Sequence, residues 1–287
     1  MQSRVLFSSR SVWTKLISMA ACLLVIACAH SHAQAPNYGT NDEHGRYADA
    51  GDARIYYEVY GEGRPLVLLH GGFSYIDSFK EYIPILSKKF RVIAVATRGY
   101  GRSELGTRKH SYALLAEDVG AVLRKEVQEK VVLLGSSDGA MVAYLVAWKY
   151  PELVHKTVVM GGSLGTRGYA QEGLRWLENV KSADLAAYRP DLRKIMPEPQ
   201  RWDEFMENLR AMWSEESVLS FEDVKKITCP VLMIVGDRDI YNRLENVVEI
   251  YRHLPNGQLA IMPNSKHIDV SPRNTAILET LIVRFLD

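Results

Sequence analysis

Cysteine and net charge are both scarce in this sequence. Cys22 and Cys28 lie near the N-terminus and Cys229 is alone in the body of the chain, so no disulfide can form there. The formal net charge of the 287 residues is only +1, without a basic patch, an arginine-rich run or an acidic tail, which argues against a nucleic-acid partner. Histidine and cysteine do not cluster at metal-ligand spacing, so the sequence predicts neither a metal site nor a cofactor.

The remaining composition is that of an ordinary globular protein. Apolar residues make up 47% of the chain and charged residues 24%, with no internal repeat and no low-complexity segment. Roughly 250 residues remain after an N-terminal leader, which is enough for one α/β domain with an inserted subdomain.

The N-terminus has the pattern of an export signal. No acidic residue precedes Asp42, and an apolar run from Leu16 to Ala27 follows three basic residues, Arg4, Arg10 and Lys15. This order is typical of a secretory signal, and the run is too short to cross a membrane comfortably. Because the run is apolar on all sides, it does not resemble an amphipathic first helix.

Two kinds of signal cleavage fit this leader. Ser31-His32-Ala33 has small residues at the spacing of ordinary signal peptidase sites, which makes residues 1–33 the signal peptide. The overlapping Ala33-Gln34-Ala35 has the same spacing, but Pro36 would hinder that cut. Val25–Cys28 instead resembles a bacterial lipobox, which would make residues 1–27 the leader and Cys28 a lipid anchor. Both interpretations predict an exported bacterial protein, either periplasmic or anchored to the outer membrane.

Strand-like and helix-like segments alternate along the rest of the chain, after a polar stretch at residues 34–50. The predicted strands are Arg54–Tyr60, Pro65–Leu69, Arg91–Ala96, Lys130–Leu134, Lys156–Met160, Pro230–Val235 and Gly257–Met262. The predicted helices are Ser111–Glu126, Ala140–Tyr150, Arg243–His253 and Asn274–Leu286. This alternation predicts an α/β fold with a mostly parallel sheet covered by helices on both faces.

The interval between Gly162 and Cys229 breaks the alternation. It contains helix formers and no convincing strand, and its aromatic residues are Tyr169, Trp176, Tyr188, Trp202, Phe205 and Trp213. We predict a helical cap at residues 163–228, inserted into a core of residues 34–162 and 229–287. Trp176 and Trp213 are candidates to line a substrate pocket, although such aromatics can equally form the cap's own core.

The segment from Val131 to Gly139 predicts a nucleophile. A buried strand leads through Gly-Ser-Ser-Asp-Gly into the helix AMVAYLVAWKY, which is G-x-S-x-G in the setting of strand, sharp turn and helix. Gly135 and Gly139 permit the close approach that this turn needs. The turn exposes the hydroxyl of Ser137 beside the positive end of the helix. Ser136 is the competing serine, but it lies outside the central position of the motif.

From about Arg54 to Asp287 the chain resembles the α/β-hydrolase superfamily. His70-Gly71-Gly72-Phe73 follows a buried strand, as the oxyanion loop of that family does, and RGYGRS at residues 98–103 resembles the family's R-G-x-G-x-S turn. The family usually has an acid two residues before this arginine, where this chain has Ala96. That departure predicts a looser turn and leaves the catalytic residues untouched.

A serine hydroxyl needs a base to become a nucleophile, and the family's order along the chain is serine, acid, histidine. The glycine-x-x-aspartate pattern after the strand at 230–236 selects Asp239, with Asp237 as the alternative acid. His267 follows the loop after the last strand and is the predicted base. His253 instead ends a helix, where histidine commonly meets the helix dipole.

The oxyanion hole needs two backbone N–H donors. The resemblance implies Asp138 as one donor and either Gly72 or Phe73 as the other, while His70 braces the loop. The G-x-S-D-G form also resembles valacyclovir hydrolase-like enzymes, which implies that the Asp138 carboxylate binds the amino group of an amino-acid ester. Alternatively, this aspartate gains only about 0.3–1 kcal/mol from the helix dipole.

The leading hypothesis is a serine hydrolase that cleaves a carboxylic ester of a small molecule through an acyl-enzyme on Ser137. The resemblance equally allows an amidase, a lactonase or a carbon–carbon bond hydrolase with the same triad. An epoxide hydrolase or haloalkane dehalogenase would require aspartate at position 137. A binding protein on the same fold is a further alternative, disfavoured because all three triad candidates are present.

Export predicts a processed mature chain. Intact-mass analysis of protein from the producing bacterium should show a chain beginning at Gln34, or one beginning at Cys28 with the added mass of acyl chains. Cell fractionation is the accompanying control. Full-length protein that retains Met1 and stays in the cytoplasm would contradict export.

Overall fold

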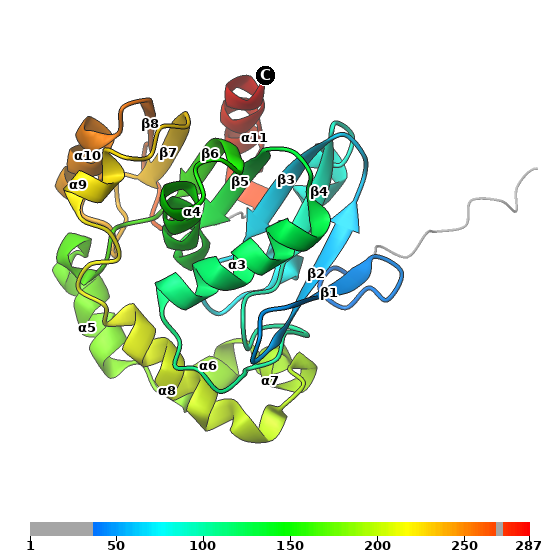
Figure 1. Ribbon diagram of the computed structural model, residues 1–287. Coiled ribbons are helices and arrows are strands. Elements are labelled where there is room, and N and C mark those ends of the chain that lie inside the picture. The colour runs from blue at the N-terminus through cyan, green and yellow to red at the C-terminus, as the bar shows by residue number, and fades with distance from the viewer. Residues whose placement is uncertain (1–36, 268–271) are drawn as a thin grey trace, which may run out of the picture. The chain divides into compact units, whose positions relative to one another are not determined.

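Eight strands form one sheet in the order β1-β2-β4-β3-β5-β6-β7-β8 (Figure 1). The computed structural model describes residues 37–267 and 272–287. The predicted signal peptide and Cys28 lie outside the described residues. The strands are β1 (Gly45–Asp49), β2 (Arg54–Tyr60), β3 (Arg64–Leu69), β4 (Phe90–Val95), β5 (Val131–Ser136), β6 (Val154–Met160), β7 (Val231–Gly236) and β8 (Gly257–Met262).

The sheet is parallel from β4 to β8 and antiparallel only where β1 meets β2 and β2 meets β4. Its central strands are almost completely buried, and every residue of β5 and β7 is inaccessible or nearly so. A strand covered on both faces carries a continuous apolar run rather than alternating polarity. This explains why PLVLL, VVLL and VLMIV were recognisable as strands in the sequence.

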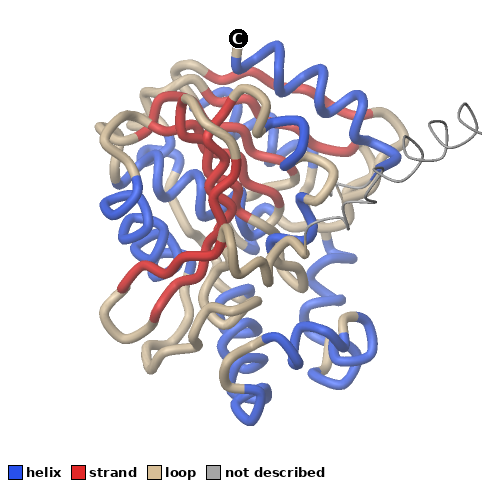
Figure 2. Tube along the Cα trace, turned by 90° about the vertical axis from the view of Figure 1, so that its right-hand side faces the viewer, coloured by secondary structure: helices blue, strands red, loops and turns tan. Residues whose placement is uncertain are grey.

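Helices cover both faces of this sheet, as the edge-on view in Figure 2 shows. The helices outside the interval between β6 and β7 are α2 (Ile83–Leu86), α3 (Tyr112–Glu126), α4 (Asp138–Lys149), α10 (Leu244–His253) and α11 (Pro272–Leu286), with the 3-10 helix η1 (Ile76–Phe79). The predicted α/β fold is confirmed. No helix among the described residues has an apolar stretch long enough to cross a membrane.

The interval between β6 and β7 contains helices and 3-10 turns, most of them below the sheet in Figure 1. They are η2 (Thr166–Gly168), α5 (Gln171–Asn179), α6 (Ser182–Tyr188), α7 (Pro190–Ile195), η3 (Pro199–Arg201), α8 (Trp202–Trp213) and α9 (Phe221–Val224). Residues Asn37–Asp287 form one compact unit. The boundaries of a separate cap at 163–228 therefore stay a prediction, and "cap" below means this segment.

Two features differ from the expectations. Residues 45–49 lie in the polar stretch for which no strand was predicted, yet they form β1. This strand lies at the edge of the sheet and pairs with β2 alone. The turn after β4 is not loosened by Ala96. The Ser103 hydroxyl donates to the Ala96 carbonyl oxygen at 2.7 Å and accepts the Tyr56 N–H at 2.8 Å, which fixes the turn without the family's acid.

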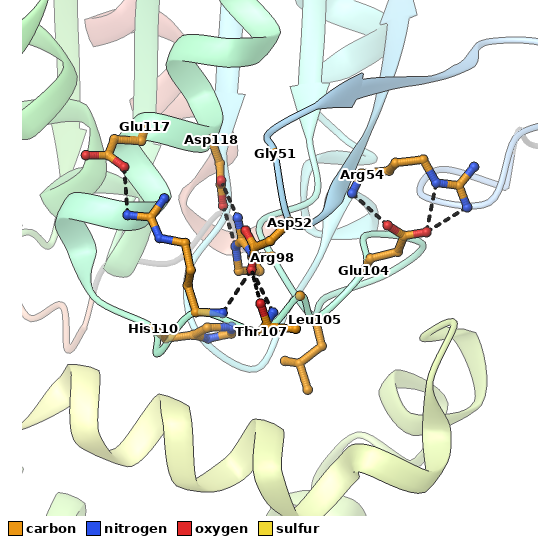
Figure 3. A network of polar contacts seen from close by, with 12 residues as sticks. Gly51, Asp52, Arg54, Arg98, Glu104, Leu105, Thr107, His110, Glu117 and Asp118 are labelled. Carbon is orange, nitrogen blue, oxygen red and sulfur yellow. Dashed lines mark hydrogen bonds and ion pairs between the residues drawn. The ribbon is translucent and has the colours of Figure 1, made fainter.

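The same turn carries a buried arginine. The Arg98 side chain has no exposed surface, and its guanidinium donates to both carboxylate oxygens of Asp118 in α3 at 2.9 and 2.7 Å (Figure 3). A third bond of 2.9 Å reaches Asp52 in the β1–β2 turn. Asp52 in turn accepts the backbone N–H groups of Thr107 and Arg108. This network joins α3, the first hairpin and the loop that leads into α3.

Removing one partner of this network should destabilise the fold strongly. Asp118→Asn leaves the Arg98 charge buried with weaker partners, and we expect a loss of about 3–5 kcal/mol in the free energy of unfolding, measured by urea titration. Glu117→Gln is the matched control, since Glu117 pairs with Arg108 and Lys149 on the surface and should cost at most about 1 kcal/mol. Equal losses in the two variants would contradict a special role for the buried pair.

Candidate active site

The predicted nucleophile lies at the turn between β5 and α4. Ser137 has φ 54° and ψ −118°, a left-handed backbone conformation that costs a non-glycine residue on the order of 1–3 kcal/mol. Its N–H is held by the Met160 carbonyl oxygen at 2.8 Å. Ser137 lines a pocket, whereas the competing Ser136 is a buried residue at the end of β5.

The two glycines of the motif make this turn possible. A Cβ on Gly135 would lie 2.1 Å from the Gly139 carbonyl oxygen, and a Cβ on Gly139 would lie 2.0 Å from the Leu69 carbonyl oxygen. Both distances are far inside van der Waals contact, so no side chain fits at either position. The packing of α4 against β3 and β5 therefore dictates both glycines.

The structure brings Ser137, His267 and Asp239 into one hydrogen-bonded line. His267 Nε2 lies 2.9 Å from Ser137 Oγ, and His267 Nδ1 lies 2.9 Å from Asp239 Oδ2. A carboxylate only accepts, so the Nδ1 proton points to Asp239 and the Nε2 lone pair accepts the serine hydroxyl proton. This is the tautomer that a general base for Ser137 requires.

Asp239 is held by more donors than the sequence indicated. Its buried carboxylate also accepts the backbone N–H groups of Tyr241 and Asn242 and the side-chain amide of Asn242. Burial raises the pKa of Asp239, but the hydrogen bonds from His267, Asn242 and Tyr241 outweigh burial and hold the pKa below its usual range. The carboxyl group is therefore an anion at neutral pH.

Sequence reasoning missed Asn242 and Tyr241. The Asn242 amide bridges Asp239 and the Gly161 carbonyl oxygen at the end of β6. The Tyr241 ring meets the His267 ring edge-on, with 4.8 Å between centroids. The one signal in the sequence was that they follow the predicted acid by two and three residues. An aspartate side chain often accepts a hydrogen bond from the backbone N–H groups at these positions.

The rejected candidates lie in other surroundings. Asp237 accepts the Ser265 N–H and faces Arg238, which is the turn-forming role expected of it. His253 bonds to the Glu249 carbonyl oxygen in its own helix and stacks on Phe221. Neither reaches Ser137.

The loop after β3 lies directly against the nucleophile. A Cβ on Gly71 would be 2.9 Å from Ser137 Cβ. His70 is fully buried: its Nδ1–H donates to the Gly71 carbonyl oxygen at 2.8 Å, and its Nε2 accepts the Thr97 N–H at 3.0 Å. Burial lowers the pKa of His70 to about 4. His70 is thus a neutral brace of this loop, as expected.

The two alternatives for the second oxyanion donor differ in their bonding. The Phe73 N–H already donates to the Tyr100 hydroxyl at 3.2 Å. In the described parts of the chain, no acceptor pairs with the N–H of Gly72 or of Asp138. Gly72 and Asp138 thus both have free N–H groups, and Gly72 fits the donor role better than Phe73 does.

A small pocket opens above Ser137. Its volume is about 120 Å³, and its aromatic walls are Phe73, Tyr169, Trp176, Trp213 and Tyr241. Both predicted cap residues, Trp176 and Trp213, line it. Of the other cap aromatics, Trp202 and Phe205 are buried in the packing of α8, and the Tyr188 side chain is 75% exposed.

Asp138 lies in the wall of this pocket with both carboxylate oxygens bonded. Oδ2 accepts the Trp213 indole N–H at 2.8 Å, and Oδ1 accepts the Tyr112 hydroxyl at 2.9 Å. Burial raises the pKa of Asp138, and the two donors partly offset that effect. In the described residues, no group of three or more acidic, histidine or cysteine side chains is placed to hold a metal ion.

Comparisons with known proteins agree with this fold. The model of the "Alpha/beta hydrolase family" matches residues 66–278. A "Putative esterase/lipase" of Haemophilus influenzae is 27% identical over 220 residues, which cover 70% of this chain and 76% of that protein. The human "Serine hydrolase BPHL" is 27% identical over 243 residues, 80% of this chain and 82% of that protein. A variant of CumD, a meta-cleavage product hydrolase of Pseudomonas fluorescens, is 26% identical with a TM-score of 0.70, covering 86% of this chain and 99% of that one.

The buried His70 predicts a pH dependence of stability. In the unfolded chain an imidazole binds a proton below about pH 6.5, while folded His70 stays neutral down to about pH 4. The contribution of neutral His70 to the free energy of unfolding is therefore fully present above about pH 6.5. It is lost as the pH falls toward 4, and the total loss is about 3 kcal/mol. Urea unfolding of wild type and His70→Gln between pH 4.5 and 8 measures this.

At pH 8, where His70 is neutral in both the folded and the unfolded chain, the difference in unfolding free energy between wild type and His70→Gln serves as the baseline. The wild type should lose more stability on acidification than the variant does. Parallel pH curves for the two proteins would contradict a neutral, buried His70.

Proposed function

Because this chain belongs to the alpha/beta hydrolase family, we propose that it is a serine hydrolase that cleaves a carboxylic ester of a small molecule. The observation that carries this proposal is the line of 2.9 Å contacts from Ser137 through His267 to Asp239. A serine aligned with a base, and a base aligned with a buried carboxylate, is the arrangement that activates a hydroxyl nucleophile.

In the proposed reaction, Ser137 Oγ attacks the ester carbonyl carbon while His267 Nε2 takes the hydroxyl proton. The negative charge on the carbonyl oxygen is met by the N–H groups of Gly72 and Asp138. His267 then gives its proton to the departing alcohol, which leaves an acyl group on Ser137. A water molecule, deprotonated by His267, attacks that acyl carbon, and the carboxylic acid leaves as Ser137 recovers its proton.

The pocket supports a small substrate. Its volume of about 120 Å³ lies below the ~300–1,000 Å³ usual for drug-sized ligands, and its aromatic walls favour an apolar acyl or alcohol group. The named esterase/lipase relative favours an ester. The alternative is an amidase, a lactonase or a carbon–carbon bond hydrolase with the same triad. A screen with amides and lactones would distinguish these activities from ester hydrolysis.

Loss of the triad should abolish turnover. Ser137→Ala should lower kcat by on the order of 10⁴-fold or more, because triad members act as a unit. Asp239→Asn should cost about 10⁴-fold, because the amide favours the wrong tautomer of His267. The measurement is kcat/KM for short p-nitrophenyl esters. Asp237→Asn, two residues from Asp239, is the matched control and should stay close to wild type, as should His253→Gln at the end of α10.

Three other results would change the assignment. Activity retained in both Ser137→Ala and Asp239→Asn would reject the triad, whereas a crippling effect of Asp237→Asn alone would move only the acid. A fluorophosphonate probe adds a second readout, since it should label Ser137 in wild type. Absence of both labelling and turnover on esters, amides and lactones would favour a binding protein.

A further inference from the structure

The carboxylate beside the nucleophile has structural partners from two distant elements. The Trp213 indole N–H at the end of α8 donates to Asp138 Oδ2 at 2.8 Å. The Tyr112 hydroxyl, in the first turn of α3, donates to Oδ1 at 2.9 Å. Tyr112 and Trp213 are both buried. Asp138 is thus the point where the nucleophile turn, the core helix α3 and the cap helix α8 meet.

The bonded pair of Asp138 and Trp213 also packs on the oxyanion loop. A Cβ on Gly72 would lie 2.8 Å from Asp138 Oδ2 and 3.1 Å from Trp213 Cζ2, so the Gly72 backbone rests directly on both groups. The Phe73 ring meets the Trp213 ring edge-on with 4.7 Å between centroids. The Asp138–Trp213 hydrogen bond therefore lies against the backbone of one candidate oxyanion donor, Gly72, and is made by the side chain of the other, Asp138.

We propose that the Asp138 side chain is a positioning group that clamps Trp213, and with it the cap, against both donors of the oxyanion hole. This inference rests on the proposed function, because it assigns a role in forming the site where Ser137 reacts. It differs from the amine-binding role that the elbow motif suggested, because the carboxylate acts on the protein rather than on the substrate.

The chemistry of the site supports a clamp. A free carboxylate next to the oxyanion would oppose the charge that builds up on the carbonyl oxygen. Two strong donors draw the carboxylate charge toward Tyr112 and Trp213, away from the reacting atoms. Apart from this bond, the Trp213 side chain has ring contacts with Phe73 and Trp176. Ring contacts alone fix a side chain less narrowly than a directed hydrogen bond does.

Trp213→Phe is the central variant, because it keeps an aromatic ring against Phe73 and removes the indole N–H together with part of the ring, a loss of volume that the control below shares. We expect kcat/KM on small esters to fall by about ten- to a hundredfold, the effect of one hydrogen bond to a charged group. Trp202→Phe is the matched control. It is the same substitution in the same helix, and the Trp202 indole N–H has no partner among the described residues, so kcat/KM should change by less than about twofold.

Variants of Asp138 separate the clamp from a general loss of structure. Asp138→Ala should lower kcat/KM about as much as Trp213→Phe does. The double variant Asp138→Ala/Trp213→Phe should have a kcat/KM only slightly below that of the less active single variant. Asp138→Asn should restore most of the activity lost in Asp138→Ala, because the amide oxygen still accepts the indole N–H and the amide N–H₂ can donate to Tyr112. Additive losses in the double variant would overturn the clamp.

Indole N–H signals in a ¹⁵N–¹H NMR spectrum test the bond without relying on activity. The Trp213 signal is assigned by its absence in Trp213→Phe. It should exchange slowly with solvent in wild type and shift in Asp138→Ala, while the Trp202 signal stays in place. Fast exchange of the Trp213 proton in wild type would overturn the clamp even if the triad variants behave as proposed. A protected proton in a protein without hydrolase activity would refute the proposed function alone.

Paired substrates decide between the clamp and the binding of an amine. The clamp predicts that Trp213→Phe lowers kcat/KM for an α-amino ester and for its deaminated analogue by similar factors, and that Asp138→Asn leaves their ratio unchanged. A wild-type preference for the amino ester that survives in Trp213→Phe and disappears in Asp138→Asn would overturn the clamp. It would assign the carboxylate to the substrate instead.

Discussion

The contact of the Gly139 backbone with the Leu69 carbonyl oxygen sets the geometry of the site. Because β3 and β5 are neighbours in a parallel sheet, their carboxyl ends release two loops at the same edge, and this contact leaves no room between them. The helix that follows β5 must begin against the end of β3, which forces Ser137 into its strained conformation. The loop of His70 to Phe73 is then brought within contact of the serine. The geometry of the proposed nucleophile and of its candidate oxyanion donors thus follows from one close backbone approach.

Buried carboxylates hold the loops around this sheet in place. Glu58 accepts the N–H groups of Gly39 and Asn41 and two tyrosine hydroxyls, which secures the segment before β1. Asp118 holds Arg98 and, through it, the turn after β4. Asp239 holds His267. Each of these carboxylates receives two or more hydrogen bonds, as a buried charge needs, and through them each holds a loop in place.

The sequence was sufficient for features that depend on local pattern. Seven of the strands were predicted within one or two residues. For the central strands this is because burial on both faces leaves an unbroken apolar run. Ser137 could be proposed from the order of strand, turn and helix, and Asp239 and His267 from the order of triad residues that the family resemblance implies. Features that depend on residues distant in the sequence could not be predicted in this way. Nothing near Asp138 in the sequence points to Tyr112 or Trp213, and the occupied N–H of Phe73 became visible only once Tyr100 was placed beside it.

The bonds of Asp138 also bear on how such a protein can change. The Asp138 backbone N–H is a proposed oxyanion donor, and the Asp138 carboxylate accepts hydrogen bonds from α3 and α8. A substitution at position 138 therefore changes the surroundings of both helices. Positions 112, 138 and 213 are thus one hydrogen-bonded unit, although the first and the last lie 101 positions apart in the sequence. Leu177 and Met141 line the pocket outside that unit. Substitutions at these two positions can alter substrate preference without breaking its hydrogen bonds. Directed evolution that randomises position 138 alone would mostly sample sequences in which the partner residues no longer match.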